Sequence, residues 1–286
     1  MIPNQRFLDL PKEFWDHVRL ISQEVGYTVR GKNQIMIPSV AEIKKAFAKV
    51  SLDWRHLADD TDNPTELGSL LESYFAHRAK VLHEFVEPLL MTADQAQEVF
   101  EKLRKKLRPK CPIPMNKQRG KKKAPAFFTG IINMIIEANA QGVTCDYDPH
   151  ILTTITCDGQ PIRTLARRID GAFPSAIDPV AVWEIKEYYY TTTFGSRVAD
   201  GVYESLLDGM ELDELRSSEG IDVKHYLMVD AHYTWWDSGR SYLCRIVDML
   251  HMGYVDEVLF GREVVTRLPQ LVKEWRSTAR KRKRAR

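Results

Sequence analysis

The sequence predicts a mixed α/β domain preceded by a helical domain. Apolar residues recur at helical spacing over 1–108, whereas β-branched apolar runs alternate with helical patterns after about residue 124. The segment between them is rich in proline and basic residues and cannot form one regular element. We therefore expect a helical N-terminal domain at 1–108, a basic linker at 109–123, an α/β domain at 124–275 and a basic tail at 276–286.

Helices account for the N-terminal domain. Their apolar residues recur every three or four positions, which is the spacing of one helix face. Ser39, followed three residues later by Glu42, is typical of a capping box at the start of a helix. The run at 35–38 fits either a strand or a turn. The helices expected here are 13–25, 41–50, 64–91 and 92–107.

Strands and helices alternate in the second domain. An apolar helix ends before Gly142, and the β-branched run at 179–187 is the clearest strand in the chain. This order predicts a mixed central sheet covered by helices. The expected helices are 126–140, 195–210 and 242–252, and the expected strands are 150–157, 161–170, 179–187, 223–230 and 255–260.

Positive charge is concentrated in two blocks, although the formal net charge is only +2. Residues 102–123 and 276–286 contain Lys and Arg but no Asp or Glu, so the rest of the chain is net acidic. Either block alone would also fit an exposed, solvated segment. Together they favour contacts with the phosphates of a nucleic acid.

Several protein classes are excluded or disfavoured. No apolar run is long enough for a membrane span, and the N-terminus has no signal-peptide pattern, so we expect a soluble, cytoplasmic protein. The sequence contains no phosphate-binding P-loop, no zinc-protease motif and no nucleophile elbow. An ATP-driven motor is therefore not expected.

Two carboxylates and one amine are predicted to meet on neighbouring strands. Asp170 ends one expected strand, and Glu184 and Lys186 lie on one face of the next because strand side chains alternate. A hairpin would bring Asp170 beside Glu184. Adjacent carboxylates repel unless a cation lies between them, and Mg²⁺ binds one or two carboxylates while keeping several waters. The alternative is a surface ion pair on an edge strand, which the apolar neighbours Trp183 and Ile185 disfavour.

One motif in the sequence consists of Asp170, thirteen intervening residues and Glu184-Ile185-Lys186. It resembles the active-site motif of the PD-(D/E)xK nuclease superfamily, which includes most type II restriction endonucleases. The resemblance covers roughly 126–262. It implies a restriction-endonuclease-like sheet whose active site lies on the second and third strands of a three-stranded antiparallel meander. It also implies metal ligation by Asp170, Glu184, the Ile185 carbonyl and Glu137, with Lys186 positioning the attacking water.

The resemblance further implies the activity. We expect a Mg²⁺-dependent DNA endonuclease, with Mn²⁺ able to substitute, and most closely a type II restriction endonuclease that acts on double-stranded DNA as a homodimer. A structure-specific repair, recombination or phage-defence nuclease is the alternative enzyme. A non-catalytic DNA-binding protein on the same fold is the alternative from another class.

Some site assignments stay open. Asp178 precedes Pro179 and is a second candidate for the metal aspartate. Glu204 and Arg197 lie on the helix after the lysine strand and are secondary candidates, whereas Glu187 has no assigned role. The basic residues expected to contact DNA are Lys117, Arg119, Lys121, Lys122, Lys123, Arg167, Arg168 and Arg197.

Overall fold

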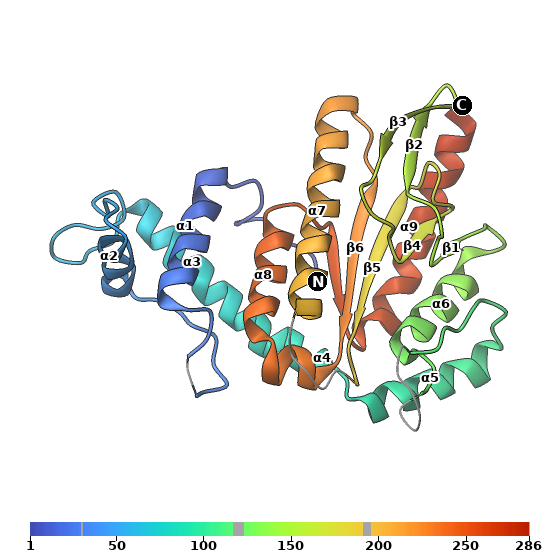
Figure 1. Ribbon diagram of the computed structural model, residues 1–286, viewed down its shortest axis with the longest axis horizontal. Helices are drawn as coiled ribbons and strands as arrows, with labels where there is room; N and C mark the ends of the chain where they lie inside the picture. The colour runs from blue at the N-terminus through green and yellow to red at the C-terminus, as the bar shows by residue number, and fades with distance from the viewer. Residues whose placement is uncertain (30, 117–122, 191–195, 286) are drawn as a thin grey trace. The chain divides into compact units, whose positions relative to one another are not determined.

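A computed structural model describes residues 1–29, 31–116, 123–190 and 196–285. The chain forms two compact units (Figure 1). Unit 1 contains Met1–Ile2, Leu89–Thr234 and Tyr254–Arg286, and unit 2 contains Pro3–Pro88 and Trp235–Gly253.

Unit 2 is helical. Phe14, Val18 and Ile21 lie on one buried face and pack with Tyr74 in a core rich in aromatic side chains. The predicted Ser39–Glu42 capping box is confirmed. Its helices are α1 (Lys12–Val25), α2 (Val40–Lys49), α3 (Glu66–Val81), the π-helical turn η1 (Leu82–Val86) and α8 (Arg240–His251); the short α4 (Glu87–Leu89) and the π-helical η3 (Tyr233–Ser238) lie at its boundaries.

A buried ion pair joins α3 to α8 within unit 2. The Arg78 guanidinium is fully buried, and its Nη1 lies 3.0 Å from Oδ2 of Asp248. The Tyr74 hydroxyl donates to Oδ1 of the same aspartate at 2.6 Å. A buried charge needs such partners, so these bonds fix α8 against α3. The segment 235–253, expected in the second domain, therefore belongs to the helical unit.

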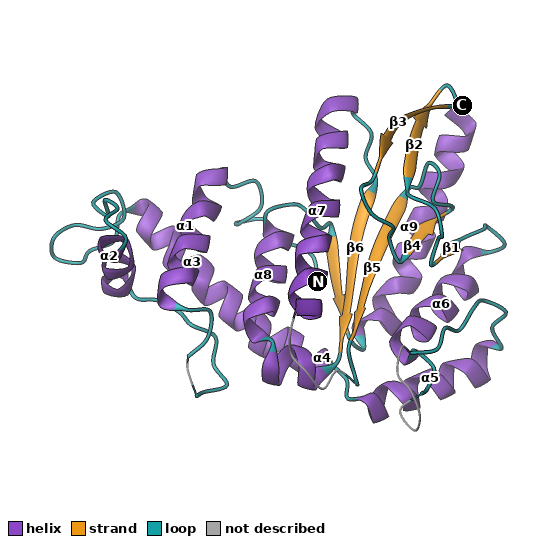
Figure 2. Ribbon diagram, in the orientation of Figure 1, coloured by secondary structure: helices purple, strands orange, loops and turns teal. Residues whose placement is uncertain are grey.

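Unit 1 contains a five-stranded mixed sheet with the order β1-β4-β5-β6-β7 (Figure 2). β1 pairs antiparallel with β4, and β4 pairs antiparallel with β5; β5, β6 and β7 are parallel to one another. A separate hairpin is formed by β2 and β3. The strands are β1 (Asp146–Tyr147), β2 (Thr154–Cys157), β3 (Gln160–Thr164), β4 (Gly171–Phe173), β5 (Ala181–Glu187), β6 (Lys224–Asp230) and β7 (Glu257–Phe260).

Helices cover both faces of this sheet (Figure 1). The alternating side chains of β5 divide between the faces: Trp183 stacks on Trp275 of α9, with ring centroids 5.4 Å apart, whereas Val182 packs with Leu212 of α7. The helices of unit 1 are α5 (Ala93–Leu107), α6 (Phe127–Ala140), α7 (Ser196–Glu219) and α9 (Glu263–Ala285). The predicted fold class, a mixed sheet flanked by helices with a helical N-terminal region, is confirmed.

The strands before β5 differ from the expected ones. Residues 150–157 and 161–170 were expected to be the first two strands of the meander, but the sheet uses the short β1 and β4 in their place. The strand before Asp170 stops at Thr164 because α7 binds the next residues. The backbone N–H of Ala166 donates to the Glu211 carboxylate at 3.1 Å, and Arg167 pairs with Asp208.

The described residues of the expected linker, 109–116 and 123, lie inside unit 1. Helix α5, which precedes it, packs on α6 so closely that a Cβ added at Gly130 would lie 2.6 Å from the Phe100 ring. The chain therefore passes between units near residue 88. The basic segment 276–286 is part of α9 as far as Ala285, and Arg282 donates to the carbonyl oxygen of Pro179 at 2.7 Å.

Candidate active site

The sheet has a notch where β4 stops, which is the edge of β5 at residues 184–187. β4 pairs with β5 only from Ala181 to Trp183, whereas β6 pairs with the whole of β5. Residues 184–187 therefore have a strand partner on one side and lack β4 on the other. Polar groups of this part of β5 face the notch, where side chains rather than a strand must satisfy them.

Asp170 fills the first position of the notch. Its Oδ2 accepts a hydrogen bond from the backbone N–H of Ile185 at 2.7 Å, and its own N–H donates to Oε1 of Glu184 at 3.2 Å. These two bonds join Asp170 to the part of β5 that carries Glu184. Burial and the charge of Glu184 together raise the pKa of Asp170 to about 6.

Lys186 lies beside Glu184 on the face of β5 that packs against α7. Its side chain is 5% exposed, and Nζ lies 2.7 Å from Oε2 of Glu184 and 3.8 Å from Oε2 of Glu204. Burial disfavours the charged amine, but Glu184 and Asp170 outweigh it and raise the pKa of Lys186. Burial likewise opposes ionisation of Glu184, yet Lys186 and Arg167 lower its pKa. The pair therefore stays charged.

Arg167 adds a second cation to this cluster. Its Nη1 lies 3.0 Å from Oε1 of Glu184 and 2.7 Å from Oδ2 of Asp208, and its Nη2 lies 3.2 Å from Oε2 of Glu204. Asp208 is fully buried, and burial with the nearby Glu184 raises its pKa to about 7. Glu204 and Asp208 are four residues apart on α7 and therefore share one helix face. Glu204 was a secondary candidate, and the i,i+4 spacing is the signal that would have found Asp208.

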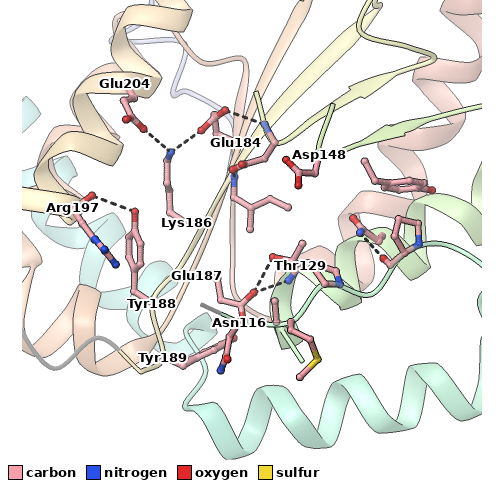
Figure 3. A pocket seen from close by; sticks show the side chains of 18 of the residues that line it. Asn116, Thr129, Asp148, Glu184, Lys186, Glu187, Tyr188, Tyr189, Arg197 and Glu204 are labelled. Atoms are coloured by element: carbon pink, nitrogen blue, oxygen red, sulfur yellow. Dashed lines mark hydrogen bonds and ion pairs between the residues drawn. The ribbon is translucent and has the colours of Figure 1, made fainter. Parts of the chain in front are cut away.

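A pocket of about 850 Å³ opens onto these side chains. Figure 3 shows Lys186 between Glu184 and Glu204, with Tyr188 directed to Arg197. Asp148, which the sequence analysis missed, also lines the pocket, and its backbone N–H donates to the Asp170 carbonyl at 2.9 Å. The lining residues are Pro112, Pro114, Met115, Asn116, Ala126, Thr129, Asn133, Tyr147, Asp148, His150, Arg167, Asp170, Glu184, Ile185, Lys186, Glu187, Tyr188, Tyr189, Tyr190, Arg197, Asp200 and Glu204.

Glu187 caps helix α6. Its Oε2 accepts hydrogen bonds from the backbone N–H and the hydroxyl of Thr129, both at 2.9 Å (Figure 3). The first turn of a helix has unsatisfied N–H groups and a partial positive charge, both of which favour a carboxylate. Glu187 therefore fixes the N-terminus of α6 to the end of β5. Burial nevertheless raises its pKa.

Glu137 does not join the pocket. Its carboxylate accepts a hydrogen bond from the backbone N–H of Lys110 at 2.9 Å. Asn133, which does line the pocket, precedes it by four residues, or about 6 Å along an α-helix. Glu137 therefore lies beyond the part of α6 that lines the pocket, where a further metal ligand was expected.

Asp178 also lies apart from this cluster. It accepts hydrogen bonds from the backbone N–H and the hydroxyl of Thr156, at 2.7 and 2.8 Å, and so ties the β2–β3 hairpin to the loop before β5. Of the two candidate aspartates, the structure places Asp170 beside Glu184.

The predicted basic contacts are distributed unevenly. Arg197 lines the pocket, and Nη1 of Arg168 lies 3.2 Å from Nδ1 of His150, a lining residue. Lys123 is exposed. The other predicted contacts in the linker, Lys117, Arg119, Lys121 and Lys122, lie outside the described residues.

The site suits Mg²⁺ better than a metal with many protein ligands. In the described ranges, no three or more His, Cys, Asp and Glu side chains form a metal-holding group. Asp170 and Glu184 nevertheless supply the one or two carboxylates that Mg²⁺ takes when it keeps its waters. The N–H and C=O of a strand residue point to the same edge, so the Ile185 carbonyl faces the notch as well. Burial and, after it, the charge of Glu184 raise the pKa of Asp170, and a bound cation would favour the ionised carboxylate.

Residues 91–275 match the family model described as Domain of unknown function (DUF7687). The chain belongs to this family. The match contains all of the candidate site, and residues 1–85 match a second model, Domain of unknown function (DUF7690). The two matches meet near residue 88, one of the positions at which the chain passes between units. Neither a curated protein nor a solved structure matches the chain. No helix in the described part of this family member is long and apolar enough to cross a membrane.

Proposed function

We propose that unit 1 is a Mg²⁺-dependent DNA endonuclease of the PD-(D/E)xK type. The observation that supports this most directly is the arrangement at the notch: Asp170 and Glu184 side by side, with the Lys186 amine 2.7 Å from Glu184. Two carboxylates and a charged lysine at the end of a central strand match the residues required for metal-assisted phosphodiester hydrolysis.

Asp170, Glu184 and the Ile185 carbonyl would hold the metal. When bound, Mg²⁺ lowers the pKa of a water and offsets the charge that develops on the phosphate oxygens, and Mn²⁺ can substitute for it. The hydrogen bond from the Ile185 N–H orients the Asp170 carboxylate towards the notch. This bond therefore fixes two of the three proposed ligands, the Asp170 carboxylate and the carbonyl of Ile185.

Lys186 would act on the attacking water and the phosphate. Its neighbours raise its pKa, so it is charged at neutral pH. A buried ammonium with several acidic neighbours offers one fixed positive charge where negative charge develops during hydrolysis. Glu204, 3.8 Å from Nζ, limits the positions that the amine can take.

DNA is the proposed substrate because the chain combines this site with clustered positive charge. Arg197 lines the pocket, and the basic block at 102–123 contains four further lining residues, Pro112, Pro114, Met115 and Asn116. Phosphate contacts of this kind make affinity fall steeply with salt. By its resemblance, the enzyme is a type II restriction endonuclease that cuts duplex DNA as a homodimer.

Cleavage assays test the proposal. Purified protein is incubated with plasmid and phage DNA in Mg²⁺, in Mn²⁺ or in EDTA, beside Lys186→Ala and the control Lys273→Ala, which alters an exposed lysine of α9. We expect metal-dependent cleavage that only Lys186→Ala abolishes. Discrete bands would identify a restriction enzyme. The absence of cleavage, with DNA binding unchanged in EDTA and in Lys186→Ala, would contradict the proposal and indicate a non-catalytic DNA-binding protein.

A further inference from the structure

One face of helix α7 carries side chains of the candidate site. Arg197, Gly201, Glu204 and Asp208 follow one another at intervals of three or four residues and therefore share this face. Arg197 and Glu204 line the pocket, and Asp208 pairs with Arg167. Of the four, Gly201 alone has no side chain. Glycine weakens a helix interior relative to alanine, so α7 gives up some helix stability at this position.

Side chains from the end of β5 fill the space beside Gly201. A Cβ added at Gly201 would lie 2.8 Å from the Tyr188 hydroxyl and 3.3 and 3.4 Å from Cδ and Cε of Lys186. Figure 3 shows both side chains directed towards α7, where the Tyr188 hydroxyl donates to the Arg197 carbonyl at 3.4 Å. The last methylenes of the lysine therefore lie directly against the bare backbone of α7.

This contact limits where the Lys186 amine can lie. Nζ is the next atom after Cε, and it lies 2.7 Å from Oε2 of Glu184 and 3.8 Å from Oε2 of Glu204. A methyl group at position 201 would crowd Cδ and Cε, and moving these carbons moves the amine with them. The crowded atoms are the ends of side chains rather than backbone, so the fold can accept the methyl group. Its effect therefore falls on the position of the amine.

We propose that Gly201 is a positioning residue for Lys186: its missing side chain leaves the space in which the lysine methylenes run and so places the amine beside Glu184. The consequence for catalysis rests on the proposed nuclease function, whereas the position of the amine can be measured without it. Displacement of a reacting group by about 1 Å can cost about 100-fold in rate. Any side chain at position 201 should therefore slow DNA cleavage while leaving DNA binding in place.

Two measurements on full-length Gly201→Ala test the proposal. The first follows the NMR signal of the Lys186 ε-methylene in protein labelled with ¹³C-lysine, in EDTA and without DNA; the signal is identified by its absence from Lys186→Ala. The second determines kcat and KM for cleavage of duplex plasmid DNA in Mg²⁺. Ser217→Ala is the matched control, because it introduces alanine at an exposed position of α7 that is not among the residues lining the pocket.

We expect Gly201→Ala to shift the Lys186 signal and to lower kcat by about 10- to 100-fold, with KM within about twofold of wild type. Its melting temperature should not fall, because alanine favours the helix more than glycine does. Ser217→Ala should leave both the signal and kcat unchanged. Tyr188→Phe removes the atom nearest to the added methyl group, so in that background Gly201→Ala should cost at least about threefold less in kcat.

An unshifted Lys186 signal in Gly201→Ala, or a kcat equal to that of wild type, would overturn the proposal. A lower melting temperature with an unshifted signal would also overturn it, because the glycine would then serve only the packing of α7. If wild-type protein cleaves no DNA, the nuclease is contradicted, and the Lys186 signal alone decides whether Gly201 places the amine. Failure of the positioning role and failure of the nuclease are therefore distinguishable.

Discussion

Nη1 of Arg167 lies 3.0 Å from Oε1 of Glu184, a carboxylate proposed as a metal ligand. The same nitrogen lies 2.7 Å from Oδ2 of Asp208, so the guanidinium is shared between β5 and α7. The proposed ligand is therefore already in contact with a cation of the protein itself. This contact should set the affinity for Mg²⁺, because the guanidinium and the metal attract the same carboxylate.

Replacing Arg167 by Gln should tighten Mg²⁺ binding. The substitution removes the competing cation and leaves Glu184 and Asp208 less neutralised, so we expect roughly tenfold higher affinity. The metal-free variant should be destabilised by up to about 3 kcal/mol, because a partly buried charge network loses one partner. Isothermal titration with Mg²⁺ and the shift in melting temperature on adding Mg²⁺ measure both effects.

Arg163→Gln serves as the control for that prediction. Arg163 lies on β3 and pairs with the exposed Glu214 at 3.1 Å, so the variant should bind Mg²⁺ like wild type. Weaker Mg²⁺ binding in Arg167→Gln would show that the guanidinium supports the metal site rather than competing for it.

Acid should weaken Mg²⁺ binding through Asp170. The pKa of this carboxyl is raised from 3.8 to about 6, chiefly by burial and by Glu184. Below pH 6 a proton competes with the metal, so affinity should fall by about tenfold per pH unit and level off above pH 7. Titrations at several pH values measure this slope, and an affinity that stays constant from pH 5 to 7 would contradict the assignment of Asp170 as a ligand.

The same pKa affects stability without metal. The folded protein keeps this proton up to about pH 6, whereas the unfolded chain releases it near 3.8, so this group's contribution to stability decreases as pH rises between those values. Asp170→Asn should remove that decrease. Urea unfolding in EDTA at pH 4.5 and 7 tests the sign: a variant with the same pH dependence as wild type would argue against it.

Gly171→Ala should distort the strand that presents Asp170. A Cβ at this position would lie 2.1 Å from two ring atoms of Trp183, which is stacked on Trp275 and cannot move easily. Overpacking of this kind costs about 1–3 kcal/mol, and the shift should reduce cleavage as well. Urea unfolding and cleavage rates measure both effects. An unchanged urea midpoint would show that β4 adjusts without cost.

Asp248→Asn should destabilise unit 2. It leaves the fully buried Arg78 guanidinium without its counter-charge, a change that typically costs about 3–5 kcal/mol. Asp16→Asn is the matched control, since its pair with Arg19 is exposed and contributes at most about 1 kcal/mol. Thermal unfolding compares the two variants; equal melting temperatures would mean that Arg78 finds another acceptor.

Local patterns predicted much of unit 1. Alternation along β5 placed Glu184 and Lys186 on one face and Trp183 on the other, as the structure has them. This works because strand side chains alternate whatever the strand pairs with. Helical spacing located α6, but it could not show that Glu137 faces Lys110, because that depends on how far α6 extends past the pocket.

Other parts of the site depend on contacts between distant residues. The sequence predicted that a long hairpin would bring Asp170 near Glu184. In the structure the two residues are brought together by the three-residue strand β4 and by side-chain hydrogen bonds. Glu187, which had no role in the sequence analysis, caps α6 from β5 across 58 residues. Neither feature leaves a local pattern, since each requires two elements to be packed first.

The sequence by itself determined the alternation of helices and strands, the mixed α/β class and the apolar strand that holds Glu184 and Lys186, because these follow from short-range periodicity. The tertiary structure alone decided that β4 ends early, that Arg167 joins Glu184 to Asp208, and that residues 112–116 face the acidic cluster across a pocket. Those features arise from side chains far apart in the chain, whose meeting depends on the packing of the whole sheet.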